Sequence, residues 1–242
     1  MIINENVHLQ IGSLIFDGID QIDVTGPFEV LSRLPNSTCR LFGTNMSSVR
    51  DMHGLKLTPD AVLADAPQLD LLHVPGGAGQ EALMENEEVL GWIRAQAAGA
   101  RIVFSVCTGA LLCGAAGLLK GRRATTIWSA IDLLPYFGAT VVNERVVVDG
   151  NWFFTADVTA GIDGALALAA ALRGQQVAET IQLAIAYAPE PPFNSGTVES
   201  ASPAVLKAAR ASVQELSANR RLTAERVANR LGINYSMKAD SI

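Results

Sequence analysis

One cysteine lies where a predicted buried strand meets a predicted helix. The apolar, β-branched stretch 101–106 runs into Cys107, and the small residues Thr108 and Gly109 follow before an Ala- and Leu-rich helical pattern. A helix that begins there aims free N–H groups and a partial positive charge at the sulfur, which lowers the thiol pKa and favours the thiolate. Gly109 lets the helix start close to the sheet. Spacing alone leaves two roles open for Cys107, a nucleophile or a buried core thiol.

A nucleophilic thiol needs a group that exchanges protons with it, and histidine is a poor candidate here. The chain has three histidines, His8, His53 and His73, and none has metal-ligand spacing to another histidine or to a cysteine. His73 lies inside a predicted strand, where a satisfied core histidine is expected. A metal site therefore has little support, and the sequence favours a carboxylate as the proton partner of Cys107.

The loop after the first predicted strand offers three carboxylates, Asp17, Asp20 and Asp23. A carboxyl group held in an apolar cleft beside a thiol has a raised pKa and exchanges protons near neutral pH. Each of the three is also a good cap for the helix expected to begin near Val24. Spacing does not choose among them.

A glycine pair, Gly76 and Gly77, follows another predicted strand. Backbone N–H groups in such a turn can face a developing negative charge, as in an oxyanion hole. The segment lacks the Gly-Lys-Ser/Thr of a P-loop and the full dinucleotide-binding spacing, so a phosphate cradle has less support. A plain strand-to-helix turn is the remaining alternative.

Apolar strands alternate with helical patterns along most of the chain. This alternation predicts an α/β fold, with a mostly parallel sheet covered by helices on both faces. Turns at Gly54 and at 149–150 predict some antiparallel pairing at an edge. The predicted strands are 9–16, 39–45, 69–75, 101–106 and a stretch within 141–155, and the predicted helices are 24–34, 81–98, 108–119, 160–174 and 177–188.

The composition changes after Tyr187, which divides the predicted organisation into two parts. Residues 1–190 are expected to form the α/β domain, and residues 191–242 an extended segment and polar helices packed on the same domain. The predicted C-terminal helices are 205–220 and 223–233. The second resembles the first half of a helix-turn-helix, but no groove-reading helix is predicted after it, so we expect no nucleic-acid partner.

The bulk composition is that of an ordinary globular protein. The chain has 242 residues, 49% of them hydrophobic and 17% charged, with a formal net charge of -6. This mildly negative net charge does not indicate binding to nucleic acid or to an anionic membrane surface. Three cysteines form no even disulfide framework, and the N-terminal residues lack a signal-peptide layout, so we expect a cytoplasmic protein with no membrane partner.

Taken together, the segments resemble the ThiJ/PfpI group of the class I glutamine amidotransferase-like superfamily. The matching segments are PGG at 75–77, SVCTGALL at 105–112 and AAGLLKGRRATT at 115–126. Within that group the isonitrile hydratases are the most similar. Their likeness rests on QIDVTGPFEVL at 21–31, NERVVVDGN at 143–151, VTAGID at 158–163 and YAPEPPFNSG at 187–196, and the resemblance runs from about residue 9 to about residue 232.

The resemblance implies a flavodoxin-like sheet with a nucleophile elbow after a central strand, and a homodimer. It also implies a cofactor-free lyase that adds water to a small isocyanide, giving an N-substituted formamide. It assigns Cys107 as the nucleophile, Asp23 as the acid and base, and Thr108 as the neighbouring hydroxyl. The positions implied to line the substrate or oxyanion site are Gly76, Gly77, Gly109 and Val158.

Two departures from the family pattern keep other functions open. Ile127 stands where histidine is usual, and Ala156 and Asp157 replace glycines. The missing histidine counts against a protease, amidase or deglycase. The alternatives are another Cys-dependent hydrolase or glyoxalase-like enzyme on the same scaffold, and a ligand-sensing or redox-regulatory protein that has lost catalysis.

Overall fold

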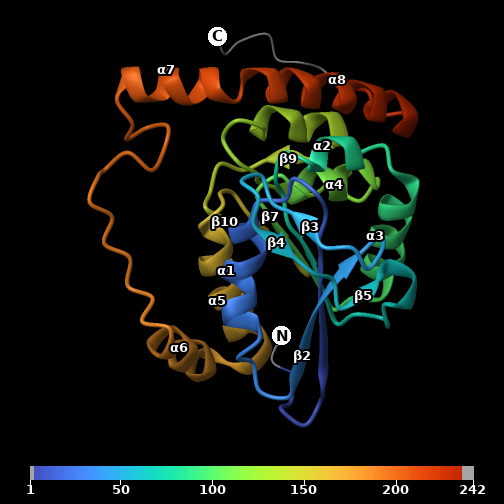
Figure 1. Cartoon of the computed structure of the whole chain (residues 1–242), viewed down its shortest axis with the longest axis vertical. Helices are drawn as coiled ribbons and strands as arrows, with labels where there is room; N and C mark the ends of the chain where they lie inside the picture. The colour runs from blue at the N-terminus through green and yellow to red at the C-terminus, as the bar shows by residue number, and fades with distance from the viewer. Residues whose placement is uncertain (1–2, 236–242) are drawn as a thin grey trace.

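A seven-stranded sheet forms the centre of the molecule in the computed structural model, which describes residues 3–235 (Figure 1). The strand order is β10-β11-β7-β6-β1-β2-β5. All neighbours pair in parallel except β10 and β11. The strands are β1 (Leu9–Leu14), β2 (Ser37–Gly43), β5 (Ala61–Val62), β6 (Leu71–Val74), β7 (Ile102–Val106), β10 (Val146–Asp149) and β11 (Trp152–Thr155). The sheet is therefore mostly parallel, as the sequence predicts.

Two neighbouring strands inside the sheet, β6 and β7, are buried at every residue. This burial explains their continuous apolar sequences, since each face of a parallel sheet is covered by helices. β10 and β11 form an antiparallel hairpin at one edge, with its turn at Gly150 (φ +65°). The predicted edge hairpin at 149–150 is confirmed.

Helices cover both faces of the sheet (Figure 1). One core cluster lies under α1 (Gln21–Leu31), α5 (Ala160–Arg173) and α6 (Gln175–Ala184). The other lies on the opposite face. Its helices are α2 (Gln80–Leu83), α3 (Glu87–Gly99), α4 (Gly109–Ala115), the 3-10 helix η2 (Ile131–Phe137) and the C-terminal α8 (Gln214–Leu231).

Several helix boundaries differ from the predicted ones. The predicted helix 81–98 is two helices, because Asn86 caps α3 by accepting a hydrogen bond from the backbone N of Val89. The predicted helix 108–119 ends at Ala115, and Gly117 follows with φ +80°. The C-terminal break falls at Val213, between α7 (Pro203–Ser212) and α8, and not near residue 221.

Short elements complete the description. They are η1 (Leu63–Asp65) and the small two-stranded pairs β3 (Val49–Arg50) with β4 (Lys56–Leu57) and β8 (Arg123–Ala124) with β9 (Thr140–Val141). β3 and β4 are antiparallel around Gly54, which confirms the predicted turn. Within residues 3–235, no helix is both long and apolar enough to cross a bilayer. Residues 236–242 of the predicted C-terminal region lie outside the described residues.

Candidate active site

Cys107 is held in an unusual backbone conformation between β7 and α4. Its φ is +53°, in the left-handed region that costs a non-glycine residue about 1–2 kcal/mol. Two contacts hold it there. The Cys107 amide donates to the carbonyl of Thr155 at 3.0 Å, and the hydroxyl of Thr126 donates to the Cys107 carbonyl at 2.6 Å. The surrounding strands thus determine the direction in which the sulfur points.

Gly109 allows α4 to begin against the sheet. A Cβ at this position would lie 1.9 Å from the carbonyl oxygen of Val74 at the end of β6. No side chain fits in that space, which confirms the predicted close approach. The carboxyl ends of β6 and β7 therefore meet directly beside Cys107, the position where open α/β sheets bind ligands.

The structure places one of the three candidate carboxylates beside the thiol. Asp23, in the first turn of α1, is fully buried next to Cys107, and the two groups shift each other's pKa. Its Oδ1 is buried without a hydrogen-bond partner among the described residues. Its Oδ2 accepts a 2.9 Å hydrogen bond from the amide of Gly76. Asp20 instead caps α1, and Asp17 accepts a hydrogen bond from the backbone of Arg50.

The Gly76–Gly77 turn joins these groups through its amides. The Gly77 amide donates to the Thr108 hydroxyl at 3.1 Å, while the Gly76 amide serves Asp23. A Cβ at Gly76 would lie 2.5 Å from the Thr108 hydroxyl, so glycine is required for the close approach. Both amides have acceptors within the protein, and their predicted oxyanion role stays a prediction.

The predicted net lowering of the Cys107 pKa is wrong for this structure, although the backbone at the helix start does lower it. Burial of the sulfur, followed by the charge of Asp23, raises the thiol pKa well above its ordinary value, and the Thr108 backbone lowers it less. Burial is also the main reason that the pKa of Asp23 is raised well above its ordinary value, and the charge of Asp20 adds to that shift. The pair therefore retains a proton more strongly than either group would in water.

One buried charge at the site was not predicted from the sequence. Arg220 in α8 is 4% exposed, and its Nη2 donates to the carbonyl of Gly77 at 2.8 Å. From the sequence, α8 is expected only to be a polar helix. The sequence held little signal for this role, because two of the five buried side chains of α8 are polar and do not stand out from its exposed face. The five buried side chains are Arg220, Thr223, Ala224, Val227 and Ala228.

The positions that depart from the family pattern lie around the site without supplying a base. Ile127 packs against both core clusters. Asp157 is half-buried; burial raises its pKa, while the charge of Arg145 lowers it. Val158, a predicted site residue, packs against the core cluster that includes Cys107.

The remaining histidine and cysteine candidates have structural roles. His73 is buried in β6 with its Nδ1 2.9 Å from the hydroxyl of Ser13, and burial lowers its pKa to about 3. Burial raises the pKa values of Cys39 and Cys113 to about 12. In the part of the chain that the structure describes, no group of three or more His, Cys, Asp or Glu side chains could hold a metal ion.

Comparison with known proteins places this geometry in a family. The DJ-1/PfpI family matches residues 10–171, which include Asp23, the Gly76–Gly77 turn and Cys107. The chain belongs to the DJ-1/PfpI family. The matched residues run from β1 into α5 and so cover most of the central sheet.

Individual members of the family differ in how closely they match. Isonitrile hydratase of Pseudomonas putida is 51% identical over 202 residues, covering 84% of this chain and 89% of that protein. A crystal structure of a ThiJ/PfpI family protein from Pseudomonas syringae superposes with a TM-score of 0.88 at 36% identity, covering 90% of this chain and 91% of the other. A deglycase of Thermococcus kodakarensis is 27% identical over 140 residues, covering 56% of this chain and 82% of that protein.

Proposed function

We propose that this DJ-1/PfpI family member is an isonitrile hydratase, a lyase that adds water to an isocyanide to give an N-substituted formamide. The observation that carries the proposal is that the Cys107 thiol and the Asp23 carboxyl are buried close enough to shift each other's pKa, with Asp23 Oδ1 unpaired among the described residues. High identity to the hydratase of Pseudomonas putida over most of both chains supports the same reaction. Ile127, in place of a histidine base, disfavours a deglycase-like reaction, whereas a Cys–Asp pair needs no histidine.

The first step forms a covalent bond to sulfur. With one proton shared in the pair, the Cys107 thiolate attacks the terminal carbon of R–N≡C, and Asp23 transfers its proton to that same carbon. One C–N π bond breaks, and the product is a thioimidate, Cys–S–CH=N–R. Asp23 is left as a carboxylate, and the total charge of the site does not change.

The second step releases the product with water. Asp23 removes a proton from water as its oxygen adds to the thioimidate carbon, and that proton passes to nitrogen. The C–S bond of the tetrahedral intermediate then breaks as its hydroxyl proton returns to Asp23. The products are R–NH–CHO, the thiolate of Cys107 and protonated Asp23, so one water is consumed and the starting pair is restored.

The positive φ of Cys107 and the contacts around it support a nucleophile elbow. In this reading Thr126 and Thr155 hold the Cys107 backbone, and Thr108, fixed by the Gly77 amide, orients the sulfur or the water. The apolar side chains around the pair, including Val158, suit a small, weakly polar isocyanide. No cofactor takes part in this scheme.

We also infer a homodimer, and the segment between α6 and α7 supports it. That segment runs along the side of the molecule away from the sheet (Figure 1), and most of its residues are exposed. The apolar side chains of Leu183 and Phe193 are 81% and 79% exposed. A second copy would remove such surface from water. A cytoplasmic location without nucleic-acid or membrane partners remains the expectation from composition.

The test is hydration of a simple alkyl isocyanide, followed as formamide production by NMR. We expect turnover by the native protein and a loss of at least about 10³-fold in Cys107→Ala and in Asp23→Asn. Cys39→Ala is the matched control, since Cys39 lies on β2, and it should keep the native rate. An undiminished rate in Cys107→Ala would exclude covalent catalysis, and no turnover of any isocyanide would refute the proposed reaction.

A further inference from the structure

Arg220 places a buried positive charge at the edge of the site, from a helix far away in the sequence. Its single hydrogen bond to a described acceptor is the one from Nη2 to the Gly77 carbonyl, 143 residues earlier in the chain. Its Nε is buried and has no hydrogen-bond partner among residues 3–235. No carboxylate among those residues lies within salt-bridge distance of it. A buried guanidinium with so few partners needs negative charge nearby.

The negative charge that faces Arg220 comes from the thiol and carboxyl pair and from α2. Arg220 interacts electrostatically with Cys107, Glu81 and Asp23. Glu81 itself accepts a hydrogen bond from the hydroxyl of Thr223, one turn along α8 from Arg220. Asp20, at the start of α1, adds negative charge that raises the pKa of both Asp23 and Cys107.

The Gly76–Gly77 turn connects Arg220 to the pair physically. Arg220 holds the Gly77 carbonyl, while the amides of the same two glycines hold Asp23 and Thr108. Each of these contacts is buried, so little water is present to screen the charge. A change at Arg220 therefore reaches Asp23, and Thr108 next to Cys107, through one turn of backbone.

We propose that Arg220 is a positioning residue of the active site, which holds the Cys107–Asp23 pair at a net charge of −1 and fixes the Gly76–Gly77 turn against it. The effect of Arg220 on turnover rests on the proposed function, whereas its effect on the charge of the pair does not. During the proposed reaction the negative charge moves from the sulfur to the Asp23 carboxylate and back, and at each stage Arg220 opposes the proton that would neutralise it. Its effect is thus to increase the reactive fraction at neutral pH.

The test is the pH dependence of Cys107 alkylation by iodoacetamide, measured by mass spectrometry of the Cys107 peptide. Access to the buried sulfur limits the rate in every variant alike, so the midpoint of the pH profile is the quantity compared. In Arg220→Met we expect the midpoint to rise by about one pH unit or more, which is a roughly tenfold slower alkylation at neutral pH. The rate should recover at higher pH.

Two further variants separate charge from structure. Arg226→Met is the matched control, because Arg226 lies on the same helix and binds Glu85 at the surface; its midpoint should stay native. Arg220→Gln keeps a hydrogen-bond donor without charge, and Arg220→Lys keeps the charge. If Arg220→Met does not fold, the Gln and Lys variants decide the question. The alkylation midpoint should rise in Arg220→Gln and stay close to the native value in Arg220→Lys. Equal midpoints in Gln and Lys, or a native midpoint in folded Arg220→Met, would overturn the proposal.

The isocyanide assay keeps the two proposals distinguishable. If the alkylation midpoint shifts in Arg220→Met but the native protein does not hydrate any isocyanide, the role of Arg220 stands and the hydratase proposal is refuted. If the native protein hydrates an isocyanide but the alkylation midpoint of Arg220→Met is unshifted, the hydratase proposal stands and the role of Arg220 is refuted. If both hold, kcat at neutral pH should fall about tenfold in Arg220→Met with little change in KM, and the difference should shrink as the pH rises.

Discussion

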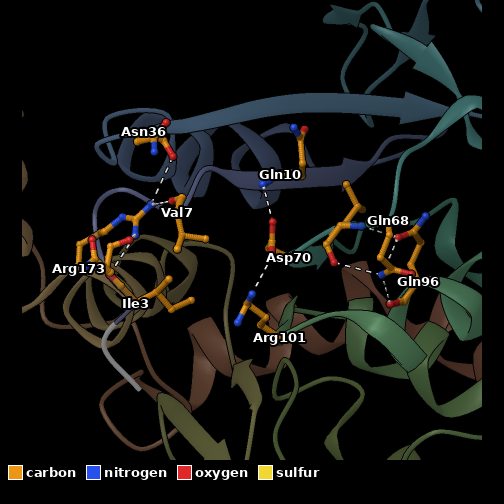
Figure 2. Close-up of polar contacts among 11 residues, drawn as sticks. Ile3, Val7, Gln10, Asn36, Gln68, Asp70, Gln96, Arg101 and Arg173 are labelled. Carbon is orange, nitrogen blue, oxygen red and sulfur yellow. Dashed lines mark hydrogen bonds and ion pairs between the residues drawn. The ribbon is translucent and has the colours of Figure 1, made fainter.

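Two arginines of this protein are equally buried and yet differ in almost everything else. Arg173, at the end of α5, is 5% exposed and donates to five backbone carbonyls, including those of Ile3, Val7 and Asn36 (Figure 2). Arg220 is 4% exposed and donates to one. The carbonyls around Arg173 belong to Ile3, Asn4, Val7, Pro35 and Asn36, at distances from 2.7 to 3.3 Å. They precede β1 and β2, at the amino edge of the sheet, whereas Arg220 lies at the carboxyl edge.

The difference shows how burial alone fails to separate a structural charge from a functional one. Five carbonyl dipoles stabilise the charge of Arg173 at close range. The same hydrogen bonds join the N-terminal residues to α5. Arg220 lacks such partners, and its field reaches the Cys107–Asp23 pair. Counting the hydrogen bonds of a buried charged group is therefore a better guide to its role than its exposure.

The largest effect we expect is at Arg173. Arg173→Met removes every donor of the guanidinium and leaves five buried or partly buried carbonyls without it, so the free energy of unfolding should fall by roughly 3–5 kcal/mol in urea titrations. Activity per folded molecule should not change, since Arg173 lies at the opposite edge of the sheet. Arg220→Met should show the reverse, with a smaller loss of stability and a larger loss of rate. A loss below about 1 kcal/mol in Arg173→Met would remove the basis of the comparison.

A smaller effect, of opposite sign, is expected at Asp23. Because burial raises the pKa of Asp23 in the folded protein, the native state binds its proton more strongly than the unfolded chain does, where the pKa is near 3.8. The stability that this proton contributes is present below about pH 4 and is lost as the pH rises through the folded pKa. Asp23→Asn should therefore be more stable than the native protein at neutral pH, by about 1 kcal/mol or more.

The measurement is the free energy of unfolding of both proteins from pH 4 to pH 8. The difference should be small at pH 4 and should grow as the pH rises, while activity is lost throughout. Asp70→Asn is a useful control, because Asp70 is a partly exposed carboxylate near the amino edge with ordinary ion-pair partners. If Asp23→Asn is less stable than native at pH 8, the carboxyl edge is not strained by its buried charges.

Local pattern was enough to predict most of the fold. β7 and α5 lie within one residue of their predicted bounds, because continuous apolar runs and small-residue helices are strong local signals. The boundary errors fall where a side-chain cap decides, as at Asn86, or where a polar helix has little apolar pattern, as in α8. Both depend on details that hydrophobic periodicity does not register.

The site was only partly predictable because its decisive contacts are long-range. Asp17, Asp20 and Asp23 are equivalent in spacing, and the choice depends on the Gly76 amide, 53 residues from Asp23. Only the family resemblance selected Asp23 in advance. The raised thiol pKa reverses a local helix argument, since burial by distant segments outweighs the N–H groups of a seven-residue helix. Arg220 reaches the site across 143 residues.

The smallest effect is expected at a third arginine, which tests whether the number of buried partners is what matters. Arg101 is half-exposed and donates through Nε to Asp70 at 2.8 Å, and Asp70 also accepts from the amide of Gln10 at 2.9 Å (Figure 2). Solvent reaches this pair, so Arg101→Gln should lower the free energy of unfolding by less than about 1 kcal/mol. Raising the salt concentration to about 0.5 M should reduce the difference further, because exposed charges are screened. The effect of Arg173→Met should persist in the same salt. If Arg101→Gln cost as much as Arg173→Met, or if salt abolished both effects alike, the five carbonyls around Arg173 would not be the reason for its contribution.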